Sequence, residues 1–178
     1  VIQGKFVARG ASYETANNAG VTPPLFWLLD TNRQYSPSRN NIDDIPDMSP
    51  GNESVWQSML SRMNVNRTYE FRGEPFADGS TLLHVAAKGC RANLVRMLLE
   101  NNADPTVRNQ AIRPCRRLGL EYNHDSSPTS CVGSPLVGRT AVEEVIGEHA
   151  EYSMREGRFS LSGASPRCKA TYEALTGR

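Results

Sequence analysis

Residues 78–109 read DGSTLLHVAAKGCRANLVRMLLENNADPTVRN, and this stretch decides the fold of the chain. Thr81 precedes a short apolar run with two alanines, which suits a capped helix that another helix can approach closely. The apolar residues between Leu94 and Leu99 recur at i, i+1, i+4 and i+5, which is one face of a second helix. Asn102 can adopt the left-handed conformation that ends such a helix. The stretch therefore predicts a helix–turn–helix unit.

The same stretch resembles an ankyrin repeat, a unit of about 33 residues that opens with T-P-L-H-x-A. TLLHVAA at 81–87 stands for that opening, and NAD at 102–104 replaces the usual Gly-Ala-Asp. Leu82 takes the place of the first-turn proline. Gly89 comes one residue before the usual turn glycine, which leaves Cys90 at that position. The resemblance implies a stack of helix pairs.

The segment before this repeat predicts another unit of the same kind. GVTPPLFWLL at 20–29 resembles a repeat opening, with proline in the first helical position, where a missing N–H is tolerated. Residues 31–52 are rich in Asn, Ser, Asp and Pro, which is loop composition. Thr22 and Met59 lie 37 positions apart, whereas the corresponding residues of the clear repeat lie 17 apart. We therefore expect a first repeat at 20–66 with a loop inserted between its helices.

The segment after the clear repeat predicts a third repeat at 111–152. Residues 113–119 overlay the opening poorly, and residues 123–138 again have loop composition. Val142 and Val145 then fall where the second helix of the clear repeat has apolar residues. This repeat is thus expected to carry its insertion in the same place as the first.

A competing assignment starts a repeat at Gly138, because GRTAVE at 138–143 also resembles an opening. That assignment puts Gly157 and Arg158 where a leucine pair is required, so the three-repeat assignment is favoured.

The two ends of the chain complete the expected architecture. Residues 1–19 form an N-terminal lead-in, residues 20–152 form the ankyrin-repeat domain, and residues 153–178 form a C-terminal capping segment. Ser165 and Pro166 suit the cap and first turn of a last helix that hides the end of the stack. The predicted fold class is all-α: about three helix–turn–helix repeats with long inserted loops and a C-terminal capping helix.

Composition narrows the functional classes. The chain has 178 residues and a net charge of +1, so no overall charge favours nucleic acid or an anionic membrane. No apolar run approaches the roughly 18 residues of a membrane span, and no signal peptide is visible. The chain begins at Val1 without methionine, so we expect an excerpt of a longer protein.

The four cysteines predict reduced, mostly buried thiols. Cys90, Cys115, Cys131 and Cys168 share no C-x-x-C spacing, which makes a zinc site unfavourable. Scattered thiols of this kind are typical of an intracellular protein, cytoplasmic or nuclear.

The sequence predicts no catalytic residue, no cofactor site and no metal site. His84 occupies the repeat opening, where its ring can bond neighbouring backbone and tie adjacent repeats together. His124 and His149 lie beside acidic residues without a nucleophile or second ligand at useful spacing. Phosphate-cradling and hydrolase motifs are absent from the sequence. The expectation is therefore a chain that is not an enzyme by itself.

Two groups of residues are candidates for partner binding. Tyr69 and Phe71 lie in the connection between repeats, where covering the edge of the helical stack is favoured over a binding tip. Arginine can form bidentate bonds to carboxylate or phosphate, although a solvated face is the slightly favoured alternative. The concentrated basic patch consists of Arg108, Arg113, Arg116 and Arg117.

These features predict a non-catalytic protein–protein interaction module, a scaffold or adaptor part of a larger protein or multi-subunit assembly. The expected partner is another protein, with no membrane and with nucleic acid not favoured. The alternative is the ankyrin portion of a multidomain enzyme. TLLHVAA at 81–87, ADPTVRN at 103–109 and the following Arg113-Pro114 are similar to the ankyrin segment of the ankyrin and zinc-finger peptidyl-tRNA hydrolases.

Overall fold

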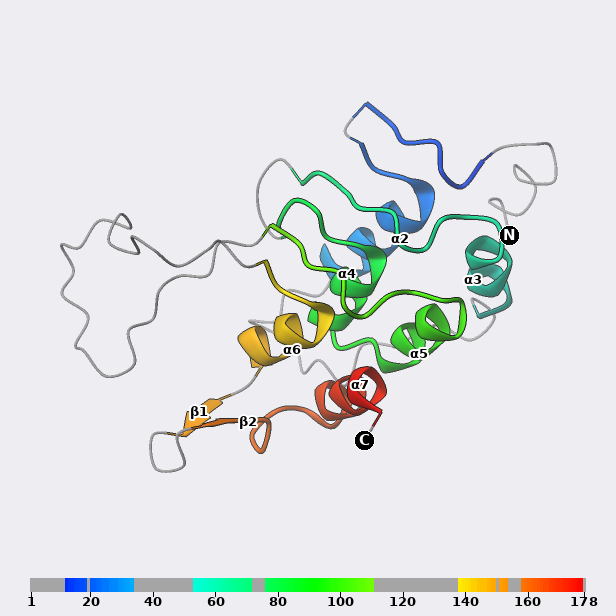
Figure 1. Ribbon diagram of the computed structural model, residues 1–178. Coiled ribbons are helices and arrows are strands. Elements are labelled where there is room, and N and C mark those ends of the chain that lie inside the picture. The colour runs from blue at the N-terminus through cyan, green and yellow to red at the C-terminus, as the bar shows by residue number, and fades with distance from the viewer. Residues whose placement is uncertain are drawn as a thin grey trace, which may run out of the picture.

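The computed structural model describes residues 12–18, 20–33, 53–71, 76–110, 138–149, 151–153 and 158–177. Within these ranges the chain forms six helices and one two-stranded hairpin (Figure 1). The elements in chain order are α2 Pro23–Arg33, α3 Glu53–Leu60, α4 Leu82–Lys88, α5 Ala92–Glu100, α6 Ala141–His149, β1 Glu151–Ser153, β2 Arg158–Ser160 and α7 Pro166–Thr176.

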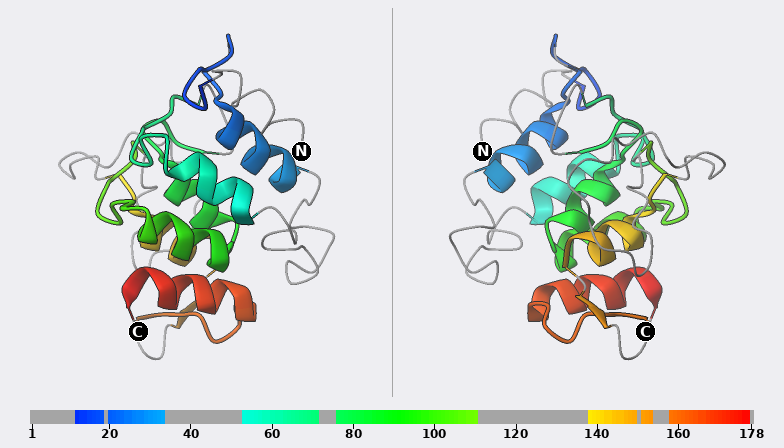
Figure 2. Two further views of the ribbon diagram at one scale, coloured as in Figure 1. Left: turned by 90° about the vertical axis from the view of Figure 1, so that its right-hand side faces the viewer. Right: turned by 90° about the vertical axis from the view of Figure 1, so that its left-hand side faces the viewer.

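The helices form a stack of pairs in two rows. Helix α4 packs against α2 on one side and against α6 on the other, and α5 packs against α7. Helices α3, α5 and α7 follow one another down the second row (Figure 2). We refer to α2/α3, α4/α5 and α6/α7 as the first, second and third pairs. The predicted class, an all-α repeat stack, is thus confirmed.

The ends of the helices lie where the capping signals place them. Helix α4 begins directly after Thr81, which has an extended backbone, and α2 begins at Pro23. Asn102 has a φ of 65°, the left-handed conformation expected for the residue that ends α5. At the start of α7, Ser165 Oγ accepts a hydrogen bond from the Cys168 amide, and Pro166 occupies the first turn.

One apolar core runs through the stack. Trp56 of α3 stacks on Trp27 of α2 with ring centroids 5.7 Å apart and planes inclined by 9°, which joins the first pair. Leu98 and Val95 of α5 are fully buried. The other large, fully buried apolar side chains are Leu25, Leu28, Met59, Leu82, Leu83, Leu94, Val85 and Val145. None of the helices in the described ranges is long and apolar enough to cross a membrane.

Helix α6 occupies a different position from the one that the sequence favours. The favoured assignment puts Val142 and Val145 in the second helix of a repeat at 111–152. In the structure α6 begins directly after Thr140 and packs along α4, as the first helix of a pair does. The packing supports the competing opening at Gly138, with α7 as the second helix. The required apolar residues come from α7 because the segment after α6 contains an extra hairpin.

That hairpin consists of β1 and β2, antiparallel, with Tyr152 opposite Phe159. It lies between the two helices of the third pair, where the sequence predicts a turn region at 153–164. The described part of the loop at 31–52 ends with α2 at Arg33, and α3 resumes at Glu53 as expected. The insertions of the first and third pairs thus both separate the two helices of a pair.

The expectation of four reduced thiols is wrong for two of the cysteines. Cys90 and Cys168 form a disulfide, with 4.6 Å between their Cα atoms and 78 positions between them in sequence. The spacing of the cysteines in the sequence does not indicate this bond, because the two residues meet only when the helix pairs stack. Disulfides are rare in reducing compartments, so the cysteines no longer argue for a cytoplasmic or nuclear protein. Cys115 and Cys131 lie outside the described residues.

Candidate interaction surface

The repeat opening is fixed by His84, whose side chain is 1% exposed. Its Nδ1 accepts a hydrogen bond from the Thr81 amide at 3.1 Å and lies 2.9 Å from the Thr81 hydroxyl. Its Nε2 lies 2.9 Å from the carbonyl oxygen of Arg139, which belongs to the third pair. The histidine therefore ties two pairs together, as the sequence suggests.

The hydrogen bonds around His84 identify its protonation state. A carbonyl oxygen only accepts, so Nε2 carries a hydrogen and donates it to Arg139. Nδ1 accepts from a backbone amide and is therefore unprotonated, which makes the ring neutral. Burial lowers the pKa of His84, and the bond to Arg139 and the charge of Glu144 oppose this shift in part.

The ends of residues 111–137 meet at a neck formed by Asn109, Gly138 and Arg139. The amide of Asn109 donates to the carbonyl of Arg139 at 3.0 Å, and the amide of Arg139 donates to Asn109 Oδ1 at 2.9 Å. A Cβ atom built on Gly138 would lie 1.3 Å from the carbonyl oxygen of Asn109. Only glycine permits this close approach, so the neck depends on Gly138.

A buried carboxylate holds the neck against α6. Glu144 is 5% exposed, and its Oε1 accepts from Asn109 Nδ2 at 2.8 Å. The same nitrogen donates to Ser80 Oγ at 3.0 Å, which brings in the segment before α4. Arg139 places its guanidinium 3.6 Å from the other carboxylate oxygen. Because burying a charge without partners is costly, these contacts have to form together with the fold.

Arg108 is the one member of the predicted basic patch within the described ranges. Its guanidinium donates to the carbonyl of Gly138 at 2.7 Å and to Glu143 Oε2 at 2.9 Å. The Arg108 side chain is 45% exposed, so solvent screens much of this ion pair. Arg108 therefore braces the neck from outside. The other three arginines, Arg113, Arg116 and Arg117, lie outside the described residues.

Tyr69 and Phe71 pack in the connection between the first and second pairs. Tyr69 is 3% exposed, and its hydroxyl lies 3.2 Å from Thr22 Oγ1. Burial raises the pKa of Tyr69. Phe71 is partly buried, with its ring centroid 6.4 Å from Tyr69 and 5.4 Å from Phe76. This geometry matches the edge-covering role and leaves Tyr69 little surface for a partner.

The turns beside these connections are bonded to one another. Asn66 donates through Nδ2 to the carbonyl of Asn102 at 3.0 Å and accepts from the Asp104 amide at 2.7 Å. Asp104 accepts from the amide and hydroxyl of Thr106, and these bonds lower the pKa of its carboxyl. The side chain of Asn66 therefore bonds to the backbone of the turn in the next repeat through both its nitrogen and its oxygen.

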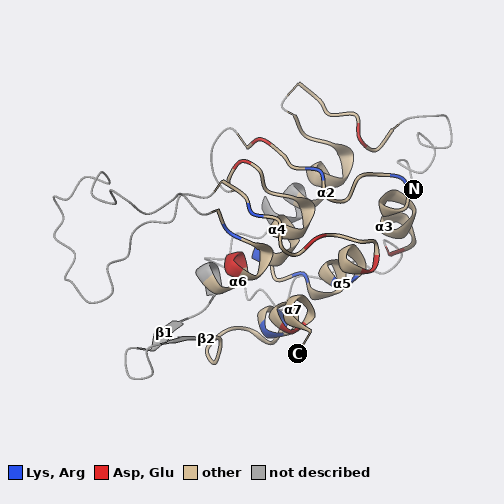
Figure 3. Cartoon of the chain, in the orientation of Figure 1, with Lys and Arg blue, Asp and Glu red and all other residues tan. Residues whose placement is uncertain are grey.

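Charged residues of both signs occur along the described chain. Lys and Arg positions and Asp and Glu positions are both found on the connections and helices (Figure 3). A search of the described residues finds no group of three His, Cys, Asp or Glu side chains placed to hold a metal ion.

Two features of this surface are absent from the sequence-based expectations. The cluster of Asn109, Glu144 and Arg139 joins residues from both sides of an insertion, so no local pattern indicates it. The disulfide had one signal, because Cys90 stands where an ankyrin repeat usually has glycine. A cysteine at a position with a φ of 51° has a reason other than backbone geometry.

The family model for the ankyrin repeat matches residues 78–110, the segment from the turn before α4 to the neck. Residues 78–110 form an ankyrin repeat. The matched segment includes the His84 bonds, the buried face of α5 and the left-handed Asn102.

A curated relative, the tRNA endonuclease ANKZF1 of Homo sapiens, is 31% identical over 117 residues. The match covers 56% of this chain and 14% of the relative, so this chain corresponds to about a seventh of that protein's length. No solved structure matches the chain significantly.

Proposed function

We propose that this chain is a non-catalytic protein–protein interaction module and serves as a scaffold or adaptor part of a larger protein or assembly. Stacked repeats present extended surfaces rather than enclosed pockets, which suits recognition of another protein. The buried polar side chains of the stack, including His84, Glu144 and Asn109, are engaged in holding the pairs together. Binding therefore falls to side chains outside this internal network.

The observation that carries the proposal is the neck. Asn109 and Arg139 fix both ends of residues 111–137 beside α6. Arg113, Arg116 and Arg117 lie in the sequence between the two residues that bond to each other at the neck. Arg108, beside the neck, is already neutralised by Glu143.

The partner that fits these three arginines is a protein segment with exposed carboxylates. Guanidinium groups form paired hydrogen bonds with carboxylates, and the small net charge of the chain favours a local contact over a broad electrostatic one. Nucleic acid is not favoured, because the net charge of the chain is only +1.

Charge reversal tests this proposal. We expect the triple variant Arg113→Glu, Arg116→Glu, Arg117→Glu to lose the partner that the wild-type chain retains in affinity purification, with an unchanged melting temperature. Arg96→Glu is the matched control, because Arg96 is exposed on α5 and bonds only locally to Asn93 within the described contacts. Retention of the same partner by the triple variant would refute the proposed surface, and a lowered melting temperature would assign the arginines to folding.

The similarity to the tRNA endonuclease ANKZF1 favours a second candidate, the ankyrin portion of a multidomain enzyme. In that case the module would regulate or target a catalytic domain elsewhere in the same protein. The full-length gene product distinguishes the two. A hydrolase or nuclease domain with a zinc finger in the same product supports the enzyme portion, and a product without a catalytic domain supports the adaptor.

A further inference from the structure

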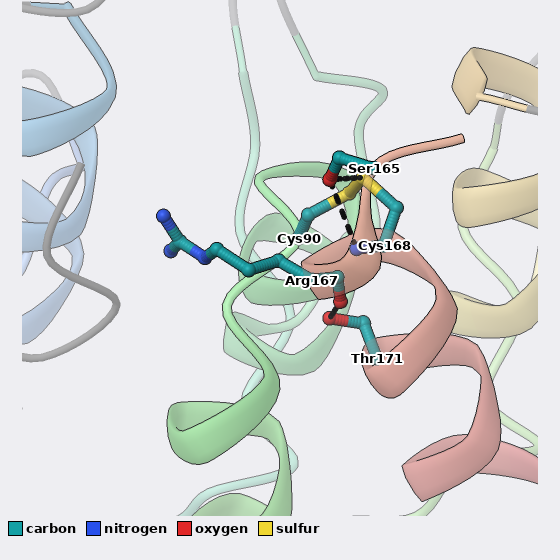
Figure 4. Close-up of a disulfide and its surroundings, with 5 residues drawn as sticks. All are labelled: Cys90, Ser165, Arg167, Cys168 and Thr171. Carbon is teal, nitrogen blue, oxygen red and sulfur yellow. Dashed lines mark hydrogen bonds between the residues drawn. A yellow bond between two sulfur atoms is a disulfide. The ribbon is translucent and has the colours of Figure 1, made fainter. Parts of the chain in front are cut away.

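We propose that the Cys90–Cys168 disulfide is a redox latch on α7: the oxidised bond holds this helix on the stack, and a dithiol reductant releases it. The bond joins the turn between α4 and α5 to the first turn of α7 (Figure 4). It therefore connects the second pair to the third. The inference is independent of the proposed interaction function.

Helix α7 packs against α5 and α6 but buries few of its own side chains completely. Of its eleven residues only Cys168, Thr171 and Leu175 are buried, and one of these three is the disulfide cysteine itself. Helix α5, against which it packs, buries five of nine: Ala92, Leu94, Val95, Met97 and Leu98. The Thr171 hydroxyl donates a hydrogen bond to the carbonyl of Arg167 within the same helix. Breaking the disulfide therefore removes the covalent link between α7 and the second pair and leaves its packing on α5 and α6.

The backbone at Cys90 indicates that the bond is the reason for the cysteine. Its φ of 51° lies in the left-handed region, which glycine adopts at no steric cost and other residues adopt with strain. Glycine is also what an ankyrin repeat usually has at this position. A cysteine that only filled space would be disfavoured here. Covalent attachment to Cys168 supplies what glycine cannot.

The surroundings of Cys168 favour its release as a thiolate. Ser165 Oγ lies 3.4 Å from Cys168 Sγ and can donate its proton to that sulfur, while the Cys168 amide donates to the same oxygen at 3.3 Å (Figure 4). Cys168 also lies in the first turn of α7, where the helix dipole stabilises negative charge. A better-stabilised thiolate is a better leaving group in disulfide exchange.

The exchange follows from this asymmetry. A thiolate of a thioredoxin-class dithiol attacks Cys90 Sγ, the disulfide bond breaks, and its electron pair leaves on Cys168 Sγ. The second thiolate of the reductant then attacks the reductant's own sulfur in the mixed disulfide. The reductant becomes a disulfide, and Cys90 departs as a thiolate. Two electrons and two protons are transferred in all. Both sulfurs are buried, so exchange proceeds when the first turn of α7 opens locally.

Hydrogen exchange on the whole chain tests the latch. We expect amides of residues 166–176 to exchange more than about tenfold faster after reduction with dithiothreitol. Amides of α3, at the other end of the stack, are expected to keep their rates, which makes them the internal control. Equal rates in α7 before and after reduction would overturn the proposal. So would a peptide map, under non-reducing conditions, that shows Cys90 and Cys168 both as free thiols.

Two substitutions at Cys90 separate the bond from the backbone strain. Cys90→Gly and Cys90→Ala both remove the disulfide, and in oxidising buffer both are expected to show the fast α7 exchange of the reduced wild type. Under reducing conditions Cys90→Gly is expected to melt above the wild type, because glycine relieves the left-handed strain, whereas Cys90→Ala is not. A Cys90→Gly variant with slow α7 exchange in oxidising buffer would show that α7 needs no latch.

A chain with Cys115→Ser and Cys131→Ser controls for exchange with the other two cysteines. The redox dependence of α7 is expected to remain in this background. Its disappearance would assign the effect to those residues and overturn the proposal for Cys90 and Cys168.

Discussion

The two junctions of the stack are built from different chemistry. Between the first and second pairs, Tyr69 packs under Thr22 and bonds to it, and aromatic rings fill the space beside α2. Between the second and third pairs, α6 lies along α4 through a polar cluster centred on Glu144, and a disulfide joins α7 to the α4–α5 turn. Both junctions contain hydrogen bonds, but a buried carboxylate and a disulfide are described only at the second.

The difference reflects how the chain crosses each junction. Residues 61–81 connect the first two pairs, and in the described parts, 61–71 and 76–81, Val65, Tyr69, Phe76, Ser80 and Thr81 are buried in the stack. The second connection includes the insertion at 111–137, and a longer loop costs more entropy to close. The neck and the disulfide act at the two sides of this junction and offset that cost. At the second junction the hydrogen bonds of the neck and the disulfide thus take the place of the shorter connecting segment that links the first two pairs.

The largest expected effect tests the apolar packing inside the first pair, next to the first junction. Trp56→Ala removes a 5% exposed ring stacked on Trp27 and is expected to lower the free energy of unfolding by about 3–5 kcal/mol, measured by urea denaturation. Phe26→Ala is the control, because Phe26 is 58% exposed on the same helix as Trp27 and little should change. Similar losses in the two variants would contradict the view that the Trp27–Trp56 stack holds the first pair.

The next effect tests the neck by steric means. Gly138→Ala places a Cβ where the Asn109 carbonyl oxygen lies, which is expected to cost about 1–3 kcal/mol in denaturant melts. Gly20→Ala is the comparison. Gly20 has a φ of 76° with nothing within 4 Å of the added atom, so its cost is that of the left-handed backbone alone, about 1–2 kcal/mol. A Gly138→Ala variant as stable as wild type would show that the neck can shift freely.

Removing the amide at the neck isolates the polar part of the second junction. Asn109→Ala leaves the buried carboxylate of Glu144 without the donor at 2.8 Å, at an expected cost of about 1–3 kcal/mol. The double variant Asn109→Ala, Glu144→Ala should recover part of the loss, because no buried charge is then left short of a donor. A double variant less stable by the sum of both single losses would argue against coupling of the two residues.

The smallest expected effect is a pH dependence of the stability of the chain, which arises from His84 at the second junction. Burial lowers the pKa of His84, so the unfolded chain takes up its proton more readily, near pH 6.5. Stability should therefore fall as pH drops below about 6.5, by at most about 1.4 kcal/mol per pH unit, until the folded ring is also protonated. Thermal melts at several pH values measure this slope. His84→Gln should flatten the slope, and an unchanged slope would assign it to other groups.

Sequence reasoning reached those parts of the fold whose signals are local. The opening at Thr81, the left-handed Asn102, the start of α3 and the Ser165 cap each depend on a few adjacent residues. Helix α6 was misplaced because the spacing rule of one repeat cannot tell an insertion within a pair from one between pairs. GRTAVE at 138–143 resembled an opening, but the hairpin after α6 moved the expected leucine positions.

The candidate surface was less accessible to prediction. Asn109 and Glu144 lie 35 positions apart, and only the neck brings them into contact. For Tyr69 and Phe71 the sequence favours an edge-covering role over a binding tip, since a lone aromatic side chain in a connection usually packs. The prediction of reduced thiols failed for Cys90 and Cys168 because cysteine spacing indicates local metal sites. It says nothing about a bond between two residues on neighbouring helix pairs.

The disulfide also closes part of the chain into a covalent ring that runs from Cys90 through α5, the insertion and α6 to Cys168. A protease that cuts once anywhere in the ring leaves both products attached to each other. A nicked molecule would therefore run as one species on a denaturing gel without reductant and as two species with it. Topologically, the stack can lose the continuity of its backbone between the second and third pairs and still remain one molecule.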